Sequence, residues 1–372
     1  MTQDNHTSQK SSTLSRIVKL TLLAIIIFPV GWLLFSPVPF DPLPQTIAPS
    51  RAGQAPFISN NLLAAADKVT VGEGPEGVAI DAQGRIVTGL EDGRIIRQER
   101  DGSINVIGET GGRPLGMDFD ARGRLIIADA VKGLVALDNG NVTVLADRFE
   151  GQTMLFVDDL SIDARGRIWF SDASQRYGFG HDSNELFEAY PSGRLMVFDP
   201  ARNNLSVALD NLYFANGVAI SKDQSFVLVN ETYAARVTRY WLAGPRRGET
   251  DVFIDGLPGF PDNITEAPNG DFWLSLVAPR TSLTDRLAAS PFFRKVIWRL
   301  TQLIGTGDIV QEHVWAVRLS PEGEVKEVLE DATGHLKMMT SVLEHENKLY
   351  LGSLTEPFVG IYALDDNKLQ NN

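Results

Sequence analysis

The sequence predicts an all-β fold and, within that class, a six-bladed β-propeller. A phrase made of an apolar strand, a turn and a second strand occurs in six copies along the chain. A second hairpin follows most copies, which gives four strands per repeat at a period of roughly forty residues. The 33 glycines and 19 prolines indicate many turns. Four-stranded repeats of this length are typical of propeller blades.

The repeated phrase defines the blades in chain order. The three most similar copies are residues 77–89, 116–129 and 160–172, and the looser copies are 217–229, the segment from Ile264, and 341–352. We expect a strand near residues 67–71 to pair with the last strand, near 360–364. Closing the ring in this way leaves no sheet edge exposed.

Composition limits the class of protein. A chain of 372 residues could hold two average domains, but one large all-β domain of this size is also common. A hydrophobic fraction of 43% is enough for a sizeable core. The net charge of -13 argues against a nucleic-acid partner, because phosphate binding needs a basic face. The absence of cysteine excludes disulfides, thiolate metal sites and thiol nucleophiles, and it favours a bacterial envelope protein over a secreted animal protein.

The N-terminal part is predicted to anchor the chain in a membrane. Residues 1–13 form a polar, disordered cytoplasmic tail, and 14–36 form a transmembrane signal anchor of roughly the length that a bilayer requires. Lysine and arginine residues precede the apolar run, and the next one after it is Arg51. Because positively charged flanks stay in the cytoplasm, the residues after the anchor are expected on the periplasmic or extracytoplasmic side. A cleaved signal peptide is the alternative, although no small-x-small pattern follows the run. Residues 37–56 are a proline-rich linker, and 57–372 form the propeller.

Two insertions interrupt the repeats. The shorter spans residues 175–190, and the longer, 279–312 in the fifth blade, has apolar residues at helical spacing. Basic residues are interspersed in the longer insertion: Arg280, Arg286, Arg294, Lys295 and Arg299. A basic amphipathic helix of this kind can lie on a membrane surface or close a site as a lid. A helix packed on the rim of the propeller would show the same pattern.

Oxygen-bearing side chains stand just before the first strand of several repeats. In a propeller these positions converge at the mouth of the central channel. The residues are Glu76, Asp158, Asn216, Asp262 and Asn263, while the second repeat has Pro114 and Leu115 in this place. Carboxylate and amide oxygens suit Ca²⁺, or another hard divalent cation, better than Zn²⁺. Any one of these residues alone would be an ordinary polar residue at a strand start.

Several of these motifs together resemble the strictosidine synthase-like family, in the branch of the adipocyte plasma membrane-associated proteins. The phrases that support the resemblance are Gly74-Pro75-Glu76, Val157-Asp158-Asp159-Leu160, Phe214-Ala215-Asn216-Gly217, residues 229–236, Pro258-Gly259-Phe260-Pro261-Asp262-Asn263 and residues 343–353. More distantly the chain is similar to the paraoxonases and to the senescence marker protein/gluconolactonase enzymes. The resemblance implies a six-bladed propeller with Ca²⁺ in its channel. In those lactonases and esterases the ion polarises the scissile carbonyl.

The resemblance assigns roles to individual residues and also shows departures. Glu76, Asn216, Asp262 and Asn263 match metal-ligand positions, and Asp158 stands where relatives often have Asn. Thr340 occupies the place of the catalytic Glu of plant strictosidine synthases. Amine–aldehyde condensation is therefore not expected of this chain.

The histidine pair of the paraoxonases is also missing, because its places hold Leu115 and Asp129. Gly77 replaces the Asp that binds their second ion, although Asp159 could still hold one. His335, near the mouth of the sixth blade, is a candidate to line the site together with Leu115 and Thr340.

These implications give two hypotheses of different classes. In the first, a membrane-anchored, calcium-dependent hydrolase cleaves lactones or aryl esters, with Asp262 as the base and Asp158 or Asp129 as alternatives. In the second, a non-catalytic propeller stabilised by its metal binds a protein or lipid partner. Membrane contact would come from the N-terminal helix and from the insertion at 279–312. The sequence has neither a Gly-x-Ser-x-Gly elbow nor a phosphate-binding loop, which argues against serine hydrolases and nucleotide enzymes.

Overall fold

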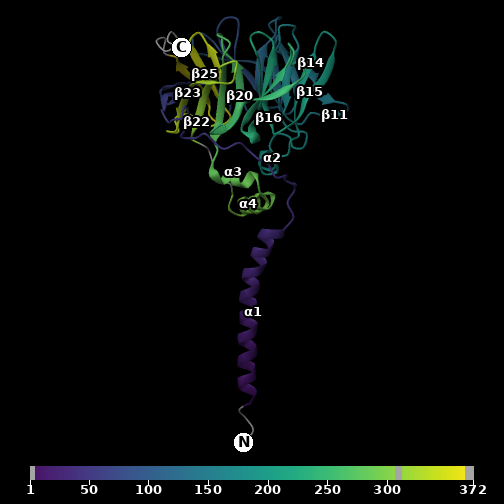
Figure 1. Cartoon of the computed structure of the whole chain (residues 1–372), viewed down its shortest axis with the longest axis vertical. Helices are drawn as coiled ribbons and strands as arrows, with labels where there is room; N and C mark the ends of the chain where they lie inside the picture. Colours follow the sequence, from purple (N-terminus) through teal and green to yellow (C-terminus); the bar gives the residue numbers. More distant parts are fainter. Residues whose placement is uncertain (1–4, 306–311, 365–372) are drawn as a thin grey trace.

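The computed structural model describes residues 5–305 and 312–364, and within them six four-stranded antiparallel sheets are arranged as propeller blades (Figure 1). The predicted six-bladed β-propeller is therefore confirmed. The first three blades contain β2 (Val78–Ile80), β3 (Ile86–Gly89), β4 (Arg94–Gln98), β5 (Ile104–Glu109), β6 (Pro114–Phe119), β7 (Leu125–Asp129), β8 (Gly133–Asp138), β9 (Asn141–Ala146), β12 (Val157–Ile162), β13 (Ile168–Asp172), β14 (Gly193–Asp199) and β15 (Asn204–Leu212). The next three contain β16 (Ala215–Ile220), β17 (Phe226–Glu231), β18 (Arg236–Trp241), β19 (Thr250–Ile254), β20 (Gly259–Glu266), β21 (Phe272–Pro279), β22 (Val314–Leu319), β23 (Val325–Asp331), β24 (Met339–His345), β25 (Lys348–Ser353), β26 (Phe358–Ala363) and β1 (Asp67–Thr70).

The ring closes as predicted. Strand β1 pairs antiparallel with β26, with Asp67 opposite Ile361 and Thr70 opposite Phe358. The first strand of the propeller thus completes the last blade, so that the sixth sheet joins both ends of the ring. This closure gives the outer strand a hydrogen-bonded neighbour instead of an open edge.

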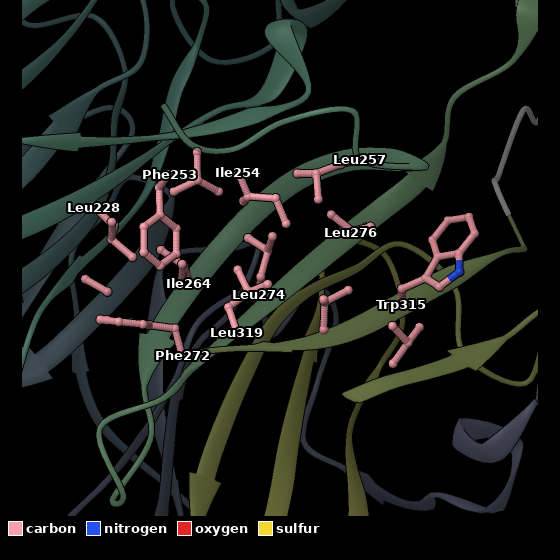
Figure 2. Packing of buried hydrophobic residues seen from close by; sticks show 14 of the residues in the cluster. Leu228, Phe253, Ile254, Leu257, Ile264, Phe272, Leu274, Leu276, Trp315 and Leu319 are labelled. Atoms are coloured by element: carbon pink, nitrogen blue, oxygen red, sulfur yellow. The ribbon is translucent and has the colours of Figure 1, made fainter. Parts of the chain in front are cut away.

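Apolar side chains between neighbouring blades hold the ring together. The cluster between the fourth and fifth blades is shown in Figure 2, where Phe253 and Leu228 face Ile264, Phe272 and Leu274. Alternate residues of each strand point to opposite faces of its sheet, and because both faces pack on a neighbouring blade, both are apolar. Truncating one such fully buried leucine to alanine costs about 2–5 kcal/mol. The core therefore fixes the angle between blades and the width of the channel.

Four helices and several short elements complete the described chain. They are α1 (Asn5–Phe35), α2 (Asp182–Glu188), α3 (Ser282–Ala288), α4 (Pro291–Ile304), the 3-10 turns Leu62–Ala65 and Thr232–Ala234, and the hairpin of β10 (Arg148–Phe149) with β11 (Gln152–Thr153). Helix α1 covers the segment expected to cross a membrane. Within the described residues, however, none of the helices meets the length and apolarity that a membrane-spanning helix needs.

All the helical additions lie at one end of the propeller. Pro279, where the insertion of the fifth blade starts, is opposite Gly259 at the beginning of the inner strand β20. Asp172, before the other insertion, is opposite Val157 at the beginning of β12. We call this end of the channel the entrance end, and the end with the turns after the inner strands the far end. Figure 1 shows α3 and α4 between the propeller and α1.

Candidate metal site at the entrance of the channel

The candidate ligands lie at irregular positions of the inner strands. The sequence predicted them just before these strands, but the structure has Asp158, Asn216, Asp262 and Asn263 inside β12, β16 and β20, and only Glu76 precedes its strand. The pairing register shifts between Val157 and Leu160, between Ala215 and Val218, and between Pro261 and Ile264. A β-bulge of this kind inserts an extra residue and turns side chains away from the regular alternation. The bulges therefore aim polar side chains along the channel where a regular strand would bury them between blades.

Glu76 and Asn263 meet across the channel although 187 residues separate them. The Nδ2 group of Asn263 donates a 2.9 Å hydrogen bond to Oε1 of Glu76. The backbone carbonyl of Glu76 accepts hydrogen bonds from the hydroxyl groups of Thr340, at 2.9 Å, and Ser341, at 2.7 Å. Blades one, five and six thus hold Glu76 by its backbone and its side chain together.

Asp262 is held in a similar way from the fourth blade. The side chain of Asn216 forms a hydrogen bond with the Asp262 carboxylate. Behind it, Asn230 Nδ2 donates to the carbonyl of Asp262, and the Thr232 hydroxyl donates to the carbonyl of Pro261 at 2.8 Å. The end of β17 therefore positions the bulge that presents Asp262 and Asn263.

Three buried oxygens at this site accept no hydrogen bond from the described residues. They are Glu76 Oε2, Asn216 Oδ1 and Asn263 Oδ1. A buried acceptor without a donor costs free energy, and a cation is the partner that several converging acceptors share. Among the described residues no three Asp, Glu, His or Cys side chains are grouped so that they could hold a metal by themselves. The amide oxygens of Asn216 and Asn263 would have to complete the ligand set, and such a mixed oxygen set fits Ca²⁺.

Burial shifts the proton affinity of the carboxyl groups in this region. Burial raises the pKa of Glu76 to about 7, against the opposing effects of Arg113 and Asn263. The pKa of Asp262 is raised well above its ordinary value by burial and by the negative charge of Glu76. Burial also raises the pKa of Asp159 to about 8. Removal from water penalises the charged form of each group, and a bound cation would remove much of that penalty.

Arg113 is a charged residue of this region that the sequence analysis did not identify. It stands directly before Pro114 in the second blade, is only 1% exposed, and donates from Nη1 to the carbonyl of Gly74 at 2.8 Å. Its guanidinium lies in the field of Glu76 and of Asp158, which is itself buried. Burial lowers the pKa of Arg113. In the sequence, the one indication of this residue was a charged side chain next to Pro114. In the structure, its positive charge offsets the buried carboxylates.

Asp129, one of the alternative bases, holds a turn. Its Oδ1 atom accepts hydrogen bonds from the backbone amides of Arg113 at 3.0 Å, Val131 at 2.9 Å and Lys132 at 2.8 Å. Asp129 is fully buried. It therefore connects the turn after β7 with the backbone of Arg113.

The three residues expected to line the site have different surroundings. Leu115 is buried in a small apolar cluster with Phe156 and Phe214. Thr340 is buried and supports the backbone of Glu76. His335 places Nε2 2.8 Å from the carbonyl oxygen of Ala66, next to the strand that closes the ring. None of these three is among the residues that line the central cavity.

A cavity of about 360 Å³ extends along the channel from the candidate metal site toward the far end. Asn263 and Asp159 line it near the site, and Glu266, Glu344 and His345 line it near the far end. Among the described residues that line it there is no Lys or Arg. The cavity walls are therefore acidic, as a channel that admits cations requires.

Close packing explains the glycine at position 77, because inner strands of neighbouring blades approach closely beside it. A Cβ atom on Gly77 would lie 2.3 Å from the carbonyl oxygen of Leu115. An Asp at this position, as in the paraoxonases, would force the first two blades apart. Asp159 accepts a 2.8 Å hydrogen bond from the backbone amide of Val218.

The fold and the site together define a class: a six-bladed propeller whose channel entrance presents two carboxylates and two amide oxygens suited to a hard cation. Comparison with known proteins specifies the family. The strictosidine synthase family model matches residues 158–245, and the strictosidine synthase-like N-terminal model matches residues 55–98. Strictosidine synthase-like protein 10 of Arabidopsis thaliana is 36% identical over 327 residues, which cover 80% of this chain and 87% of the relative. The chain belongs to the strictosidine synthase-like family.

Two other comparisons extend this result. Adipocyte plasma membrane-associated protein of Bos taurus is 31% identical over 392 residues, covering 96% of this chain and 95% of the relative. A gluconolactonase from Xanthomonas campestris superposes with a TM-score of 0.60 at 17% identity, covering 88% of this chain and 97% of that one. The calcium-binding protein regucalcin from Agrobacterium tumefaciens gives a TM-score of 0.55 at 14% identity, covering 79% and 94%. At these identities the two structures show that the fold is shared.

Proposed function

We propose that this protein is a divalent-cation-dependent hydrolase of lactones or aryl esters, with Ca²⁺ as the expected ion. The observation that carries the proposal is the set of buried oxygens without donors, Glu76 Oε2, Asn216 Oδ1 and Asn263 Oδ1, next to the Asp262 carboxylate. The names of the structural neighbours, a gluconolactonase and a calcium-binding regucalcin, support a lactonase-type chemistry on this fold.

The residues of the chain have separate roles in this proposal. Glu76, Asn216, Asp262 and Asn263 would hold the ion, which supplies Lewis-acid polarisation of a substrate carbonyl when bound. The bulges keep these side chains in place before substrate arrives, because their backbones are fixed by neighbouring blades. Such preorganisation avoids reorganisation during the reaction.

The general base is assigned by elimination among three carboxylates. Asp129 already uses one oxygen for three backbone amides. Asp158 is buried and lies in the field of the Arg113 guanidinium. Asp262 lies at the site itself and has the amide of Asn216 as its partner. We therefore assign Asp262 as the group that activates water, with Asp158 as the second candidate.

Membrane association is part of the proposal. The sequence predicts an anchor at residues 14–36 with the propeller outside the cytoplasm. A relative that matches nearly the whole chain is named a plasma membrane-associated protein. Fractionation of cells that express the full chain, followed by carbonate extraction, tests this part. Recovery of the protein in the extracted soluble fraction would contradict a single-pass anchor.

The enzymatic proposal is tested with metal analysis and a substrate panel. The purified full chain is analysed for bound metal, stripped with a chelator, and assayed on aliphatic lactones, gluconolactone and phenyl esters with and without added Ca²⁺. We expect turnover that disappears with the chelator and returns with Ca²⁺, and that Asp262→Ala and Glu76→Ala abolish. Asp81→Asn, a carboxylate change at the far end, serves as the matched control. Calcium binding without turnover on any substrate would favour the non-catalytic propeller, and turnover unchanged in Asp262→Ala would refute the mechanism.

A further inference from the structure

Helix α4 buries basic side chains and exposes large apolar ones, the reverse of the usual arrangement of a surface helix. Arg294 and Arg299 are 3% and 4% exposed, whereas Phe293 and Leu303 are 57% and 62% exposed. An ordinary surface helix places its apolar stripe inward and its charges outward. The buried basic residues and the exposed apolar residues of the hairpin of α3 and α4 therefore both need an explanation.

The buried arginines bind backbone carbonyls of the N-terminal segment. Arg299 donates from Nη1 to the carbonyls of Leu33, at 3.0 Å, and Leu34, at 3.1 Å, and from Nε to that of Ser36, at 2.9 Å. The last carbonyls of an α-helix lack partners within the helix, and these three lie at the C-terminal end of α1. Arg299 therefore joins the end of α1 to α4.

The other two buried arginines fix the hairpin to the propeller. Arg294 donates to the carbonyls of Glu188 and Ala288, each at 2.8 Å. Arg280 donates to the carbonyls of Leu257 at 3.0 Å and Ala48 at 2.8 Å. Three of the five basic residues of the insertion thus point inward, because these backbone carbonyls need donors. The hairpin is therefore firmly held at the entrance end.

The outward surface of this hairpin is mainly apolar, with Arg286 as its exposed basic residue. We define the docking surface by its exposed apolar residues, which are Leu283, Phe292, Phe293, Leu303 and Ile304. Exposed Arg286 lies beside them, and α4 contains no acidic residue although the chain has a net charge of -13. The exposed side chains of Trp32 and Phe35 on α1 continue the apolar character toward the end of that helix. Each large apolar side chain left in water forgoes about 1.5–3 kcal/mol of burial.

The charge and the position of this surface select its partner. Exposed apolar patches mark interaction sites. This patch continues the exposed apolar side chains Trp32 and Phe35 at the end of α1, to which Arg299 joins α4. Aromatic and aliphatic side chains with flanking basic groups suit the headgroup region of a bilayer that contains anionic lipid. Both helices lie on the α1 side of the propeller (Figure 1). The same end of the propeller contains the candidate metal site.

We propose that the docking surface of α3 and α4 inserts into the lipid headgroup region and holds the channel entrance against the membrane. On this geometry the substrates are amphipathic esters or lactones that partition into lipid and reach the site from the bilayer surface. The part of this inference that concerns substrates rests on the proposed hydrolase function. The part that concerns lipid contact does not.

Lipid contact is tested by site-specific labelling of the full chain, which has no native cysteine. Phe293→Cys and, as the matched control, Ala82→Cys in an exposed turn at the far end are each labelled with an environment-sensitive fluorophore. The proteins are reconstituted into phosphatidylcholine–phosphatidylserine vesicles with or without headgroup-proximal spin-labelled lipid. We expect several-fold quenching and a blue shift at position 293, and neither at position 82. Equal signals at both positions, whether quenched or not, would overturn the inference.

The substrate class is tested with one pair of esters. Phe292→Ser/Phe293→Ser is compared with the unsubstituted chain on a short, water-soluble phenyl ester and on a long-chain ester held in the same vesicles. We expect unchanged turnover of the soluble ester and a several-fold loss on the vesicle ester. Equal activity on the vesicle ester would refute delivery from lipid. Absence of turnover on both esters in the unsubstituted chain would instead refute the proposed function, and the quenching result would still decide lipid contact.

Discussion

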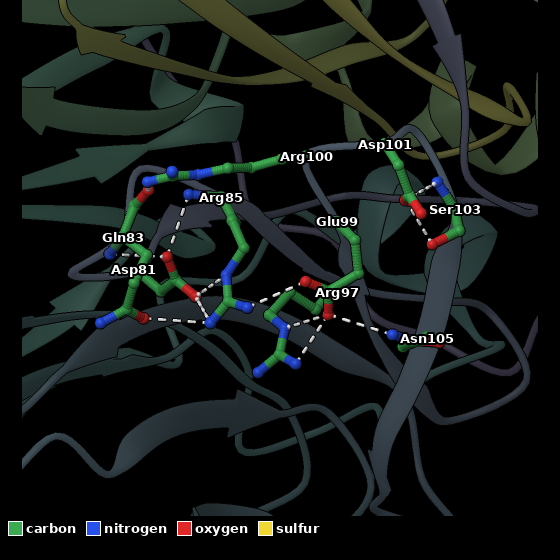
Figure 3. A network of polar contacts seen from close by, with 9 residues as sticks. All are labelled: Asp81, Gln83, Arg85, Arg97, Glu99, Arg100, Asp101, Ser103 and Asn105. Atoms are coloured by element: carbon green, nitrogen blue, oxygen red, sulfur yellow. Dashed lines mark hydrogen bonds and ion pairs between the residues drawn. The ribbon is translucent and has the colours of Figure 1, made fainter.

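The two ends of the channel differ in whether the oxygens of their repeated polar side chains have hydrogen-bond donors. At the far end, the turn after an inner strand contains an Asp whose hydrogen bonds are satisfied: Asp81 accepts from the amides of Gln83 and Arg85 and from Arg85 Nε, at 2.8–3.0 Å (Figure 3). The same arrangement recurs at Asp120 with Arg124 and at Asp163 with Arg167. At the entrance end, Glu76, Asn216 and Asn263 keep oxygens without donors.

This difference separates structural repetition from a candidate site. Hydrogen bonds to the charged form lower the pKa of Asp81 although partial burial opposes them, whereas burial raises the pKa of Glu76 to about 7. Satisfied carboxylates terminate turns and recur from blade to blade. Unsatisfied oxygens are costly and persist where another partner offsets the cost. In this ring, therefore, the departures from the repeat indicate where a ligand would bind.

The largest difference between the two ends is expected in calcium affinity. Glu76→Gln keeps the shape of the side chain but removes a charged oxygen from the site. Changes one shell away from a metal typically cost 10–100-fold in affinity, so we expect at least about 100-fold weaker Ca²⁺ binding by titration calorimetry. Asp81→Asn, the corresponding change at the far end, should alter affinity by less than about twofold, since that end is not a ligand set. Equal losses of affinity in the two variants would contradict the assignment of the metal site to the entrance end.

The next largest effect concerns how the free energy of unfolding depends on pH after Ca²⁺ has been removed with a chelator. The folded chain binds the Glu76 proton more tightly than the unfolded chain does, so this group makes stability fall as pH rises from 4.5 to about 7. Asp81, whose pKa is lowered, acts in the opposite direction. Its contribution to the stability of the fold is present above pH 3.8 and is lost as the pH falls below that value. Scanning calorimetry across this range should show a decline that Ca²⁺ flattens. Glu76→Gln should make the decline shallower without Ca²⁺, while Asp159 and Asp262, whose pKa values burial also raises, retain part of it. An unchanged slope in that variant would contradict the assignment.

The smallest effect is expected for an ion pair at the far end. Arg124 pairs with Asp120 at 2.8 Å, with side chains 23% and 13% exposed. Arg124→Ala leaves the two backbone amides of the turn bound to Asp120, so we expect a loss of only about 0.5 kcal/mol in urea unfolding. Calcium affinity should not change. A loss above about 2 kcal/mol would contradict this expectation, because ion pairs near the surface seldom contribute that much.

Much of the fold followed from patterns that are local in the sequence. Alternating apolar strands, turn residues and the repeat length predicted the blades, and the register of β1 with β26 confirms the predicted closure. The convergence of Glu76, Asn216 and Asp262 followed from their equivalent positions in the repeats. These features depend on strand geometry and on ring symmetry, which neighbouring residues specify.

The sequence could not specify which groups would lack partners. The bulges that move Asp158, Asn216 and Asp262 into the strands, the hydrogen bond between Glu76 and Asn263, and the burial of Arg113 all depend on residues from other blades. The inward direction of Arg294 and Arg299 depends on where the N-terminal segment crosses the propeller.

The repeats of the sequence were sufficient to predict a six-bladed propeller with oxygen-bearing side chains gathered at one end of its channel. Contacts between distant segments set which of those oxygens lack donors and which face of the fifth-blade helices is exposed. Hydrogen-bond satisfaction and burial are properties of neighbours in space. In this chain those neighbours lie 187 residues apart at the candidate metal site, where Asn263 meets Glu76, and 263 residues apart where Arg299 binds the carbonyl of Ser36.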